Sequence, residues 1–414
     1  MNVSVIGGGL AGLSVGYHLK KRSINSTIFE AQDYVGGLLR SVKIDGWTFD
    51  SGGSHIIFSK SKDILNEILA VIGDFIEHRR RTYIFYKKRY IEYPFENGMY
   101  SLDRNERYEI LKDFVRNLMM KKDDPKNLLD WFYYSFGEAI TEKYLRPYNE
   151  KIWKRDLRKI SIDWVGRIPK PPIDDILRSS VGIKTEGYKH QLKFYYPLKG
   201  GIETFARNLV KDLNVKLSFP VRSLKFEDNK IIINNKYICD KLIYTAPLKE
   251  IGNYIKLDRE IKDEIKKLDY NSLTVVGLAI RGRVPNFHWI YIPDPDIVFH
   301  RIAFISNYSP YMAPNGCSTV IAEISHKNKI KEVEDEVISG LKRLGFDFNI
   351  EFSRSWTWKY AYVILNSEYN KIMEKIRNYL MEREIIPFGR FGNWEYLNMD
   401  QVWVAAKELV SAIA

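Results

Sequence analysis

The sequence predicts an α/β fold, in which a Rossmann-like dinucleotide-binding domain is interleaved with a helical insertion and a mainly antiparallel β-sheet domain. An apolar run at residues 3–6 leads through a glycine-rich turn into a helical pattern at 10–21, and a second apolar strand follows at 26–30. Helical periodicity dominates residues 102–165, whereas 273–324 consist mostly of strand-like runs punctuated by prolines. These observations predict a β-α-β unit, a helical insertion and a second sheet, in that order.

Periodicity also places the elements after the β-α-β unit. Apolar residues recur at helical spacing over 105–121 and 128–144, which predicts two helices. Short strands are predicted at 215–219, 231–233 and 242–245, with Asx pairs marking turns between some of them. The sequence shows no internal repeat or low-complexity linker, so we expect interleaved domains. The predicted divisions are a dinucleotide-binding domain of residues 1–75, 198–265 and 375–414, a helical domain of 100–165, and a substrate-carrying sheet domain of 76–99, 166–197 and 266–374.

Composition excludes several classes of protein. The 414 residues are 45% hydrophobic and 28% charged, as in a soluble globular protein. No apolar run approaches the roughly 18 residues of a spanning helix. The N-terminal residues lack the pattern of a signal peptide, which predicts a cytoplasmic protein. Cys239 and Cys317 form no C-x-x-C pair, so neither a disulfide nor a metal site is predicted, and packing is the expected role of both.

The net charge of +12 comes from 64 basic against 52 acidic residues. The basic residues are distributed among acidic ones, and the local runs at 78–81 and 87–89 are short. A solvated basic face and attraction of a small anionic ligand both explain this pattern. We therefore predict no nucleic-acid partner.

The first glycine-rich turn has the features of a dinucleotide site. Gly7, Gly9 and Gly12 form G-x-G-x-x-G between a strand and a helix, and Glu30 ends the next strand. Gly7 would permit the tight turn, Gly9 the approach of a pyrophosphate, and Gly12 close packing of helix and strand. A carboxylate at Glu30 suits a ribose diol, so FAD or NAD fits and NADP does not. Taken alone, the motif also fits a purely structural turn.

Two further glycine-rich turns favour FAD over NAD. Residues 36–41 have the sequence Gly-Gly-Leu-Leu-Arg-Ser, and residues 50–55 have the sequence Asp-Ser-Gly-Gly-Ser-His. The glycine pairs would bring backbone close to the cofactor, and the arginine could face its phosphates. The residues predicted to contact FAD here are Gly37, Leu38, Arg40, Ser54 and His55.

The three turns together resemble the amine oxidase, protoporphyrinogen oxidase and UDP-galactopyranose mutase group of flavoproteins. The stretch 240–247 is similar to the strand by which such folds return to the FAD domain, and the resemblance would put Val221 and Arg222 near the adenine side. Segments 136–153, 299–311 and 389–401 resemble the mutases in particular. The resemblance covers nearly the whole chain.

The resemblance implies a role for each matching residue. The implied catalytic residues are Arg167 and Arg301, which would grip a substrate diphosphate, and His55, whose segment would lie against the flavin. The implied substrate-binding residues are Tyr93, Phe95, Asn149 and Trp153 around uracil, Trp289, Tyr291 and Asn307 near the substrate, and Tyr360 and Tyr396 at the diphosphate. A C-terminal flavin motif would contribute Gly389, Arg390, Asp400 and Gln401. Singly, each of these residue types is more often structural.

The implied activity is the interconversion of UDP-galactopyranose and UDP-galactofuranose, a UDP-sugar isomerisation with no net redox change. Reduced FAD would act through N5 as a nucleophile on the anomeric carbon, so an external reductant such as NAD(P)H is expected. Two alternatives stay open, namely an FAD-dependent oxidase or dehydrogenase of the amine oxidase or protoporphyrinogen oxidase type, and a flavin- or nucleotide-sugar-binding protein without turnover. A loop at 167–187 is expected to close over the sugar. Glu96 departs from the family glutamine, and the sequence leaves open whether the subunits form a homo-oligomer.

Overall fold

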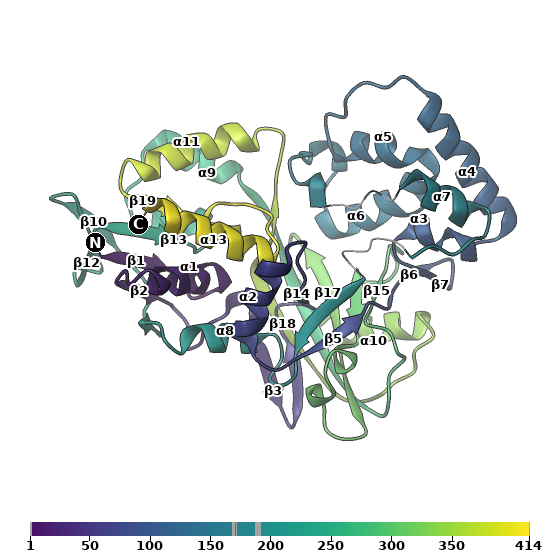
Figure 1. Cartoon of the computed structure of the whole chain (residues 1–414), viewed down its shortest axis with the longest axis horizontal. Helices are drawn as coiled ribbons and strands as arrows, with labels where there is room; N and C mark the ends of the chain where they lie inside the picture. The colour runs from purple at the N-terminus through teal and green to yellow at the C-terminus, as the bar shows by residue number, and fades with distance from the viewer. Residues whose placement is uncertain (1, 168–169, 171, 187–191, 414) are drawn as a thin grey trace.

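We describe a computed structural model of the chain, which covers residues 2–167, 170, 172–186 and 192–413. The described residues form a parallel-sheet unit, a helical unit and a second sheet unit, and a cavity lies where the three meet (Figure 1). Both ends of the chain lie in the parallel-sheet unit (Figure 1). This arrangement confirms the predicted α/β fold class.

The parallel sheet is built around the N-terminal strand. All four residues of β1 (Val3–Ile6) are buried, and the strand pairs with β2 on one side and β13 on the other. Burial of every residue, with three of the four apolar, suits a parallel strand that is covered on both faces. The strands in order across the sheet are β19 (Ile385–Pro387), β13 (Lys241–Tyr244), β1, β2 (Ser26–Phe29) and β9 (Val215–Lys216). The helices that pack beside it include α1 (Leu10–Lys21), α13 (Met399–Ile413) and α8 (Glu203–Val210).

The helical unit matches the predicted insertion, with ends that differ by a few residues. Its helices are α4 (Arg104–Met119), α5 (Leu128–Ile140), the π-helical turn η3 (Thr141–Leu145), α6 (Arg146–Trp153) and α7 (Ile173–Ser180). Asp103 and Asn127 cap α4 and α5 through side-chain oxygens that accept backbone N–H bonds. Gly137 adopts φ +79° within α5, where a Cβ atom would lie 2.5 Å from Asp113 Oδ2. This break and the π turn redirect the chain into α6, and such irregular turns often occur at functional sites.

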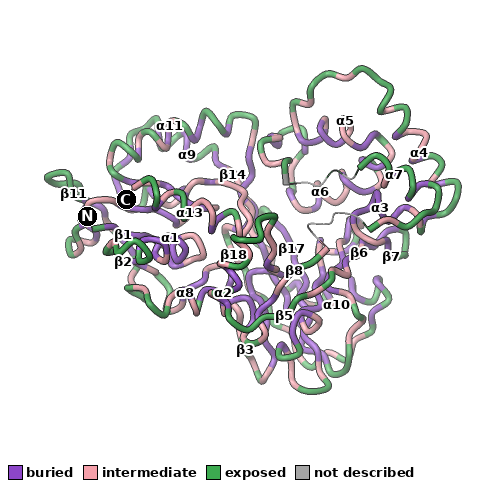
Figure 2. Tube along the Cα trace, in the orientation of Figure 1, coloured by how far each residue is buried: buried purple, intermediate pink, exposed green. Residues whose placement is uncertain are grey.

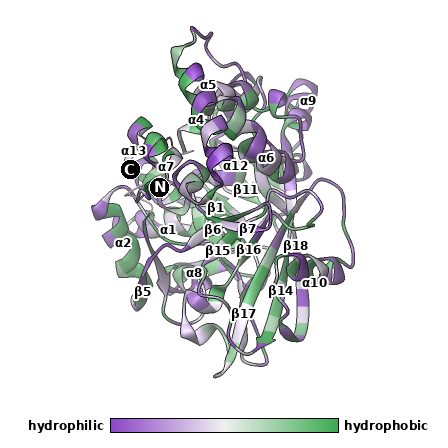
Figure 3. Ribbon diagram, turned by 90° about the vertical axis from the view of Figure 1, so that its right-hand side faces the viewer, coloured by the Kyte–Doolittle hydropathy of each residue, from purple (hydrophilic) through white to green (hydrophobic). Residues whose placement is uncertain are grey.

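The second sheet contains the longest strands of the described chain. Its order is β18 (Asn349–Ile364), β14 (Asp269–Arg281), β17 (Cys317–His326), β16 (Arg301–Ala303), β15 (Trp289–Tyr291), β6 (Thr82–Tyr86) and β7 (Arg89–Glu92). Adjacent strands are antiparallel except for β15 and β6, so the prediction of a mainly antiparallel sheet is confirmed. Hydrophobic residues colour much of β14 and β17 green (Figure 3), and nearly every residue of β17 is buried.

Smaller elements connect and cover these units. The strands are β3 (Ser41–Ile44), β4 (Trp47–Asp50), β5 (Phe75–Arg79), β8 (Lys193–Pro197), β10 (Leu224–Glu227), β11 (Lys230–Ile233) and β12 (Tyr237–Cys239). The helices are α2 (Lys62–Ile72), α3 (Phe95–Gly98), α9 (Arg259–Lys267), α10 (Glu334–Arg343), α11 (Tyr369–Met381) and α12 (Gly389–Gly392), and the 3-10 turns are η1 (Gly37–Leu39), η2 (Met99–Ser101), η4 (Leu157–Lys159), η5 (Val165–Arg167), η7 (Leu248–Asn253), η8 (Ile305–Asn307) and η9 (Pro310–Met312).

Buried residues follow the strands and the inner faces of the helices, whereas exposed residues follow the outer loops (Figure 2). Buried apolar side chains form clusters against the parallel sheet, inside the helical unit and against the second sheet. Among the described residues, we find no helix that combines the length and apolarity needed to cross a bilayer.

Candidate cofactor and substrate cavity

A cavity of about 760 Å³ extends from the first glycine turn to the helical unit. Its walls come from segments far apart in the chain: the turns after β1 and β4, helices α5 and α6, the second sheet, and the start of α13. The predicted site residues that line it are Gly7, Gly9, Glu30, Gly37, Leu38, Ser54, His55, Tyr93, Asn149, Trp153, Trp289, Tyr291, Arg301, Arg390, Tyr396 and Asp400. The fold thus brings most of the described sequence-predicted residues to one place, while their individual roles stay predictions.

The first glycine turn has the geometry that the motif requires. Gly7 adopts φ +106°, which favours glycine. A Cβ atom on Gly12 would lie 1.9 Å from the Gly7 carbonyl oxygen, so α1 packs against the turn too closely for any side chain. A Cβ atom on Gly9 would meet nothing within 4 Å. The turn therefore leaves an open approach to backbone at Gly9, beside the N-terminus of α1, as a pyrophosphate would need.

Glu30 is held at the end of β2 by backbone donors. Its Oε2 atom accepts from Gly8 N–H at 2.6 Å, and its Oε1 atom accepts from Gln32 N–H at 2.8 Å. An ionised carboxylate has about four lone-pair positions, so these bonds leave capacity for the two hydroxyls of a ribose. The carboxylate is thus fixed in position at the cavity wall.

The second and third glycine turns pack against each other. A Cβ atom on Gly52 would lie 2.0 Å from the Leu38 carbonyl oxygen. Gly53 adopts φ +106°, and a Cβ atom there would lie 3.2 Å from Glu323 Oε2. Glycine at both positions therefore lets the turn carrying Ser54 and His55 lie between the second glycine turn and the second sheet.

His55 is an uncharged ring in this turn. Its Nδ1 atom lies 3.0 Å from the Gly53 carbonyl oxygen, which can only accept, so Nδ1 carries the hydrogen. Burial lowers the pKa of His55 to about 4, although Glu323 acts in the opposite direction. At neutral pH the ring therefore presents Nε2 as a hydrogen-bond acceptor.

Arg301 is held by a buried carboxylate. Its Nε and Nη2 atoms donate to Glu323 Oε1 and Oε2 at 2.8 and 2.6 Å, which is a bidentate pair. Glu323 is fully buried, and its Oε1 atom also accepts from the backbone N–H and the hydroxyl of Ser54 at 2.9 and 2.8 Å. Burial opposes ionisation of Glu323, but the Arg301 guanidinium overcomes that effect and holds its pKa at about 2. One carboxylate thus orients both Arg301 and the turn that carries His55.

Replacing Glu323 by glutamine should destabilise the protein at neutral pH. The variant leaves the Arg301 charge without its counter-ion, which costs on the order of 3 kcal/mol. The folded pKa of about 2 lies below the ordinary value of 4.5, so this stabilisation is present above pH 4.5 and is lost as the pH falls towards 2. Urea unfolding of both proteins at several pH values measures the difference. A stability gap that stays constant over this pH range would contradict the ion-pair account.

Arg80 is a cavity residue that the sequence analysis missed. It lies over the rings of Tyr93 and Trp289, at 4.6 and 4.7 Å from their centroids, although its basic run suggested a solvated face. Its neighbour Arg79 is exposed and pairs with Glu186. Strand alternation at the end of β5 was the signal that could have separated the two arginines. Other cavity residues that were missed include Tyr148, His300, Glu323 and Tyr362.

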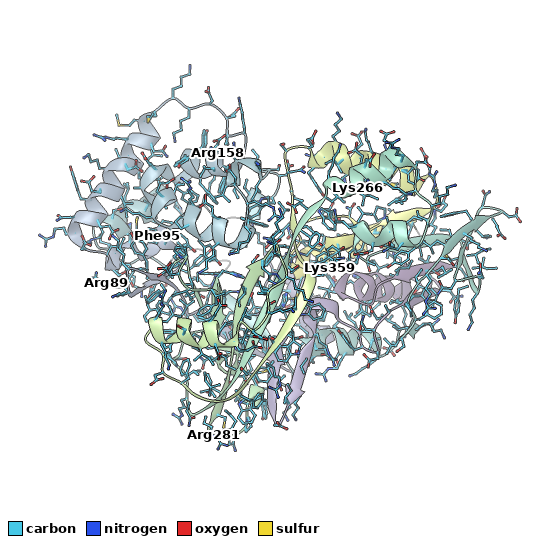
Figure 4. The ribbon with its side chains drawn as sticks, turned by 180° about the vertical axis from the view of Figure 1, so that it is seen from behind. Arg89, Phe95, Arg158, Lys266, Arg281 and Lys359 are labelled. Atoms are coloured by element: carbon cyan, nitrogen blue, oxygen red, sulfur yellow. The ribbon has the colours of Figure 1, made fainter. Side chains whose placement is uncertain are left out.

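Tyr362, rather than Tyr360, lines the cavity, and this corrects the sequence-based assignment. The Tyr360 hydroxyl donates to Glu250, and its ring lies 4.5 Å from that of Tyr270. The neighbouring Lys359, labelled in Figure 4, also pairs with Glu250 at 2.6 Å. The pairing of β14 with β18 shifts register between Asn271 and Leu273, where β18 contains extra residues. This irregularity changes which tyrosine reaches the cavity.

Two other predicted contacts with substrate are also corrected. Phe95 is fully buried in the interior of the helical unit, with the Tyr86 and Tyr144 rings each 5.3 Å away (Figure 4). Asn307 uses its side-chain amide to donate to the carbonyl oxygens of Pro285 and Phe287 at 2.8 and 2.6 Å. Neither residue lines the cavity. Both are structural residues in this arrangement.

Several predicted cofactor residues also lie outside the cavity wall. The Arg40 guanidinium pairs with Glu203 at 2.9 Å instead of facing the cavity. Arg222 and Gln401 are exposed, whereas Val221, which was expected near the adenine side together with Arg222, does line the cavity. Gly12 and Gly389 allow neighbouring segments to pack closely. A Cβ atom on Gly389 would lie 2.5 Å from the Cβ atom of Ala11. The Arg167 side chain and part of the proposed 167–187 loop lie outside the described residues.

The described residues fit a bound FAD. Gly9 gives an open approach at a helix N-terminus, and Glu30 supplies a fixed carboxylate at the expected distance along the chain. Arg390 and Asp400 also line the cavity, and Arg390 Nε and Asp400 Oδ1 are buried polar atoms that have no hydrogen-bond partner among the described residues. Buried polar atoms usually have partners, so a polar ligand at these two residues would complete the site.

Comparisons with known proteins agree with this reading. A family described as NAD(P)-binding Rossmann-like domain matches residues 5–70, and one described as flavin containing amine oxidoreductase matches residues 173–354. Protoporphyrinogen oxidase 2 of Arabidopsis thaliana is 23% identical over 462 residues, which cover 94% of this chain and 89% of that protein. A 1-hydroxycarotenoid 3,4-desaturase of Flavobacterium sp. is 22% identical over 343 residues, which cover 73% of this chain and 66% of the desaturase.

Among solved structures, a reduced UDP-galactopyranose mutase has a similar fold. The TM-score is 0.91 at 24% sequence identity, and the match covers 100% of this chain and 95% of the mutase. The fold is therefore shared along the whole chain, including all three units that form the cavity.

Proposed function

We propose that the chain is a flavoprotein of the amine oxidase-like superfamily and, within it, a UDP-galactopyranose mutase, which interconverts UDP-galactopyranose and UDP-galactofuranose. The observation that carries this proposal is the Arg301–Glu323 pair, which fixes a guanidinium in the cavity wall beside tyrosine and tryptophan rings. Planar guanidinium groups bind phosphate oxygens in two-point contacts, and aromatic faces suit a nucleobase. The extent of the fold similarity to a mutase supports the same reading.

In this proposal the chain provides binding and charge rather than a nucleophile. When bound and reduced, FAD supplies a nucleophilic nitrogen, N5, for displacement of the diphosphate from the anomeric carbon. Residues around Gly9, Glu30, Arg390 and Asp400 would hold the cofactor. Arg301 would stabilise the charge of the diphosphate as it separates from the sugar and keep it in place for its return.

The aromatic wall would hold the nucleoside part of the substrate. Tyr93 and Tyr291 lie with ring centroids 5.0 Å apart, and Tyr148 lies 5.2 Å from Tyr291. On the neighbouring helix, Asn149 accepts from Trp153 Nε1 at 3.1 Å, which fixes its amide. Such a wall can stack a base and exclude water from the diphosphate, which strengthens its interaction with Arg301.

A flavin oxidase or dehydrogenase is the second candidate, because the curated relatives include an oxidase and a desaturase. That reading accounts for the cofactor residues, but it gives the fixed guanidinium of Arg301 no diphosphate to bind.

We expect the dithionite-reduced protein to convert UDP-galactofuranose into UDP-galactopyranose under anaerobic conditions. The oxidised protein serves as the control and should form no product, because N5 of oxidised flavin is an electron-poor imine nitrogen and not a nucleophile. Chromatography of the sugar nucleotides measures the conversion. Parallel reactions with UDP-, GDP- and dTDP-sugars define the accepted nucleotide. A protein that binds UDP but yields no pyranose product after reduction would contradict the mutase proposal and favour the oxidase or a binding protein.

A further inference from the structure

His300 precedes β16 and is a buried part of the cavity wall. Its side chain is almost fully buried, and its Nε2 atom lies 3.4 Å from the Tyr362 hydroxyl. On the other side of the ring, Nδ1 accepts from Ser325 N–H at 3.3 Å. Both His300 and Tyr362 line the cavity that also holds Arg301. His300 therefore connects a backbone donor of the second sheet to a hydroxyl at the cavity.

The direction of these hydrogen bonds is set by the backbone. Ser325 N–H can only donate, so His300 Nδ1 must accept, and a neutral ring then carries its hydrogen on Nε2. Burial lowers the pKa of His300 to about 3, against an opposing effect of Glu323, so the ring is neutral at physiological pH. Nε2–H therefore donates to the Tyr362 oxygen. The reverse tautomer would point two N–H groups at each other.

Tyr362 then has one hydrogen left to donate. Within the described part of the chain, the His300 contact is the hydrogen bond recorded for this hydroxyl, and in that bond the hydroxyl oxygen accepts. Tyr362 is partly buried, and burial and the nearby Glu323 raise the pKa of its hydroxyl against an opposing effect of Arg301, so the hydroxyl keeps its hydrogen. A hydroxyl hydrogen without an acceptor in such surroundings is unfavourable. A ligand oxygen in the cavity is the acceptor that this geometry favours.

We propose that His300 is a positioning residue, which holds the Tyr362 hydroxyl as a hydrogen-bond donor to an anionic oxygen bound beside Arg301. The inference rests on the proposed function, because it assigns that oxygen to the substrate diphosphate. His300 itself touches neither the reacting atoms nor the sugar in this scheme. Because His300 Nε2–H donates to the Tyr362 oxygen, the Tyr362 hydroxyl cannot donate its own hydrogen to His300.

The test is a double-mutant cycle on FAD-loaded protein, read out as the dissociation constants of UDP and of inorganic pyrophosphate by calorimetry. Tyr362→Phe removes the hydroxyl, and His300→Phe keeps a ring but removes both nitrogens. Each change should weaken binding of both anions by about 10-fold, the size expected for one hydrogen bond to a charged group. In the double variant, binding should be within about two-fold of that of Tyr362→Phe alone, because the effect of His300 acts through that hydroxyl.

His300→Gln provides the rescue, since its amide can still donate to Tyr362. It should bind both anions within about three-fold of wild type, even if losing the Ser325 contact lowers the melting temperature. The inference is overturned if the losses multiply in the double variant, if His300→Gln binds as weakly as His300→Phe, or if the wild type binds neither anion. A wild type that binds both anions and shows the coupling, but converts no UDP-galactofuranose, leaves this inference standing and removes only the mutase proposal.

Discussion

Arg301→Ala is expected to abolish turnover of UDP-galactofuranose, with kcat/KM lowered at least about 10³-fold, while FAD stays bound. The loss follows because a fixed donor to developing charge contributes about 10²- to 10³-fold, and Arg301, when paired with Glu323 through Nε and Nη2, still has hydrogens on both Nη1 and Nη2 to donate. FAD should remain because its predicted contacts at Gly9, Glu30 and Asp400 belong to other segments. The measurements are anaerobic kinetics and the flavin absorbance per polypeptide.

Alanine at this position also leaves Glu323 buried without its partner, so a conservative variant is needed. Arg301→Lys keeps a positive charge beside Glu323 but replaces the planar two-point donor by a single ammonium group. It should fold, bind FAD and still lose about 100-fold in kcat/KM. Arg354→Ala is the matched control, because Arg354 is an exposed arginine on β18. Near wild-type turnover by Arg301→Lys would show that a two-point grip is unnecessary.

Substitution of two glycines of the first motif should affect different properties of the protein, namely FAD binding for Gly9 and stability of the fold for Gly12. Gly9→Val is expected to leave the folded chain intact but reduce FAD content at least about 10-fold, since its side chain would occupy open space where the pyrophosphate approaches. Gly12→Ala should instead destabilise the fold by several kcal/mol, because its Cβ atom would overlap the Gly7 carbonyl oxygen.

Thermal unfolding of the apoprotein and flavin content after reconstitution separate the two effects. Gly9 has an extended backbone at φ −74°, which valine can adopt. A lower FAD content of Gly9→Val would therefore not result from backbone strain. If Gly9→Val takes up FAD with unchanged affinity, the pyrophosphate does not lie against this turn.

Local patterns predicted the parts of the fold that depend on neighbours in sequence. The helix at 10–21 has the predicted ends, because the glycine motif and the strand before it fix where that helix starts. The ends of α4 and α5 were shifted by a few residues, since caps and the π turn decide them. Cavity residues carried on glycine turns could be predicted for the same reason.

The misplaced residues depend on partners that are distant in sequence. Arg40 turns away from the cavity because Glu203, 163 positions later, binds it. Tyr362 lines the cavity where Tyr360 was predicted to do so, next to an irregularity in the pairing of β14 and β18. Alternation of residues along a strand does not reveal such an irregularity. The Arg80 side chain lies in the cavity wall because its guanidinium packs over the rings of Tyr93 and Trp289. No local pattern contains this information.

The parallel sheet has a consequence for how distant parts of the chain combine. β1 pairs with β13, which lies more than two hundred residues later in the sequence, and β13 in turn pairs with β19. Asp400 lies on α13, which follows β19 in the chain. The two ends of the predicted cofactor site are therefore joined through this sheet, and removing α13 would take away Asp400 while leaving the first glycine turn in the chain.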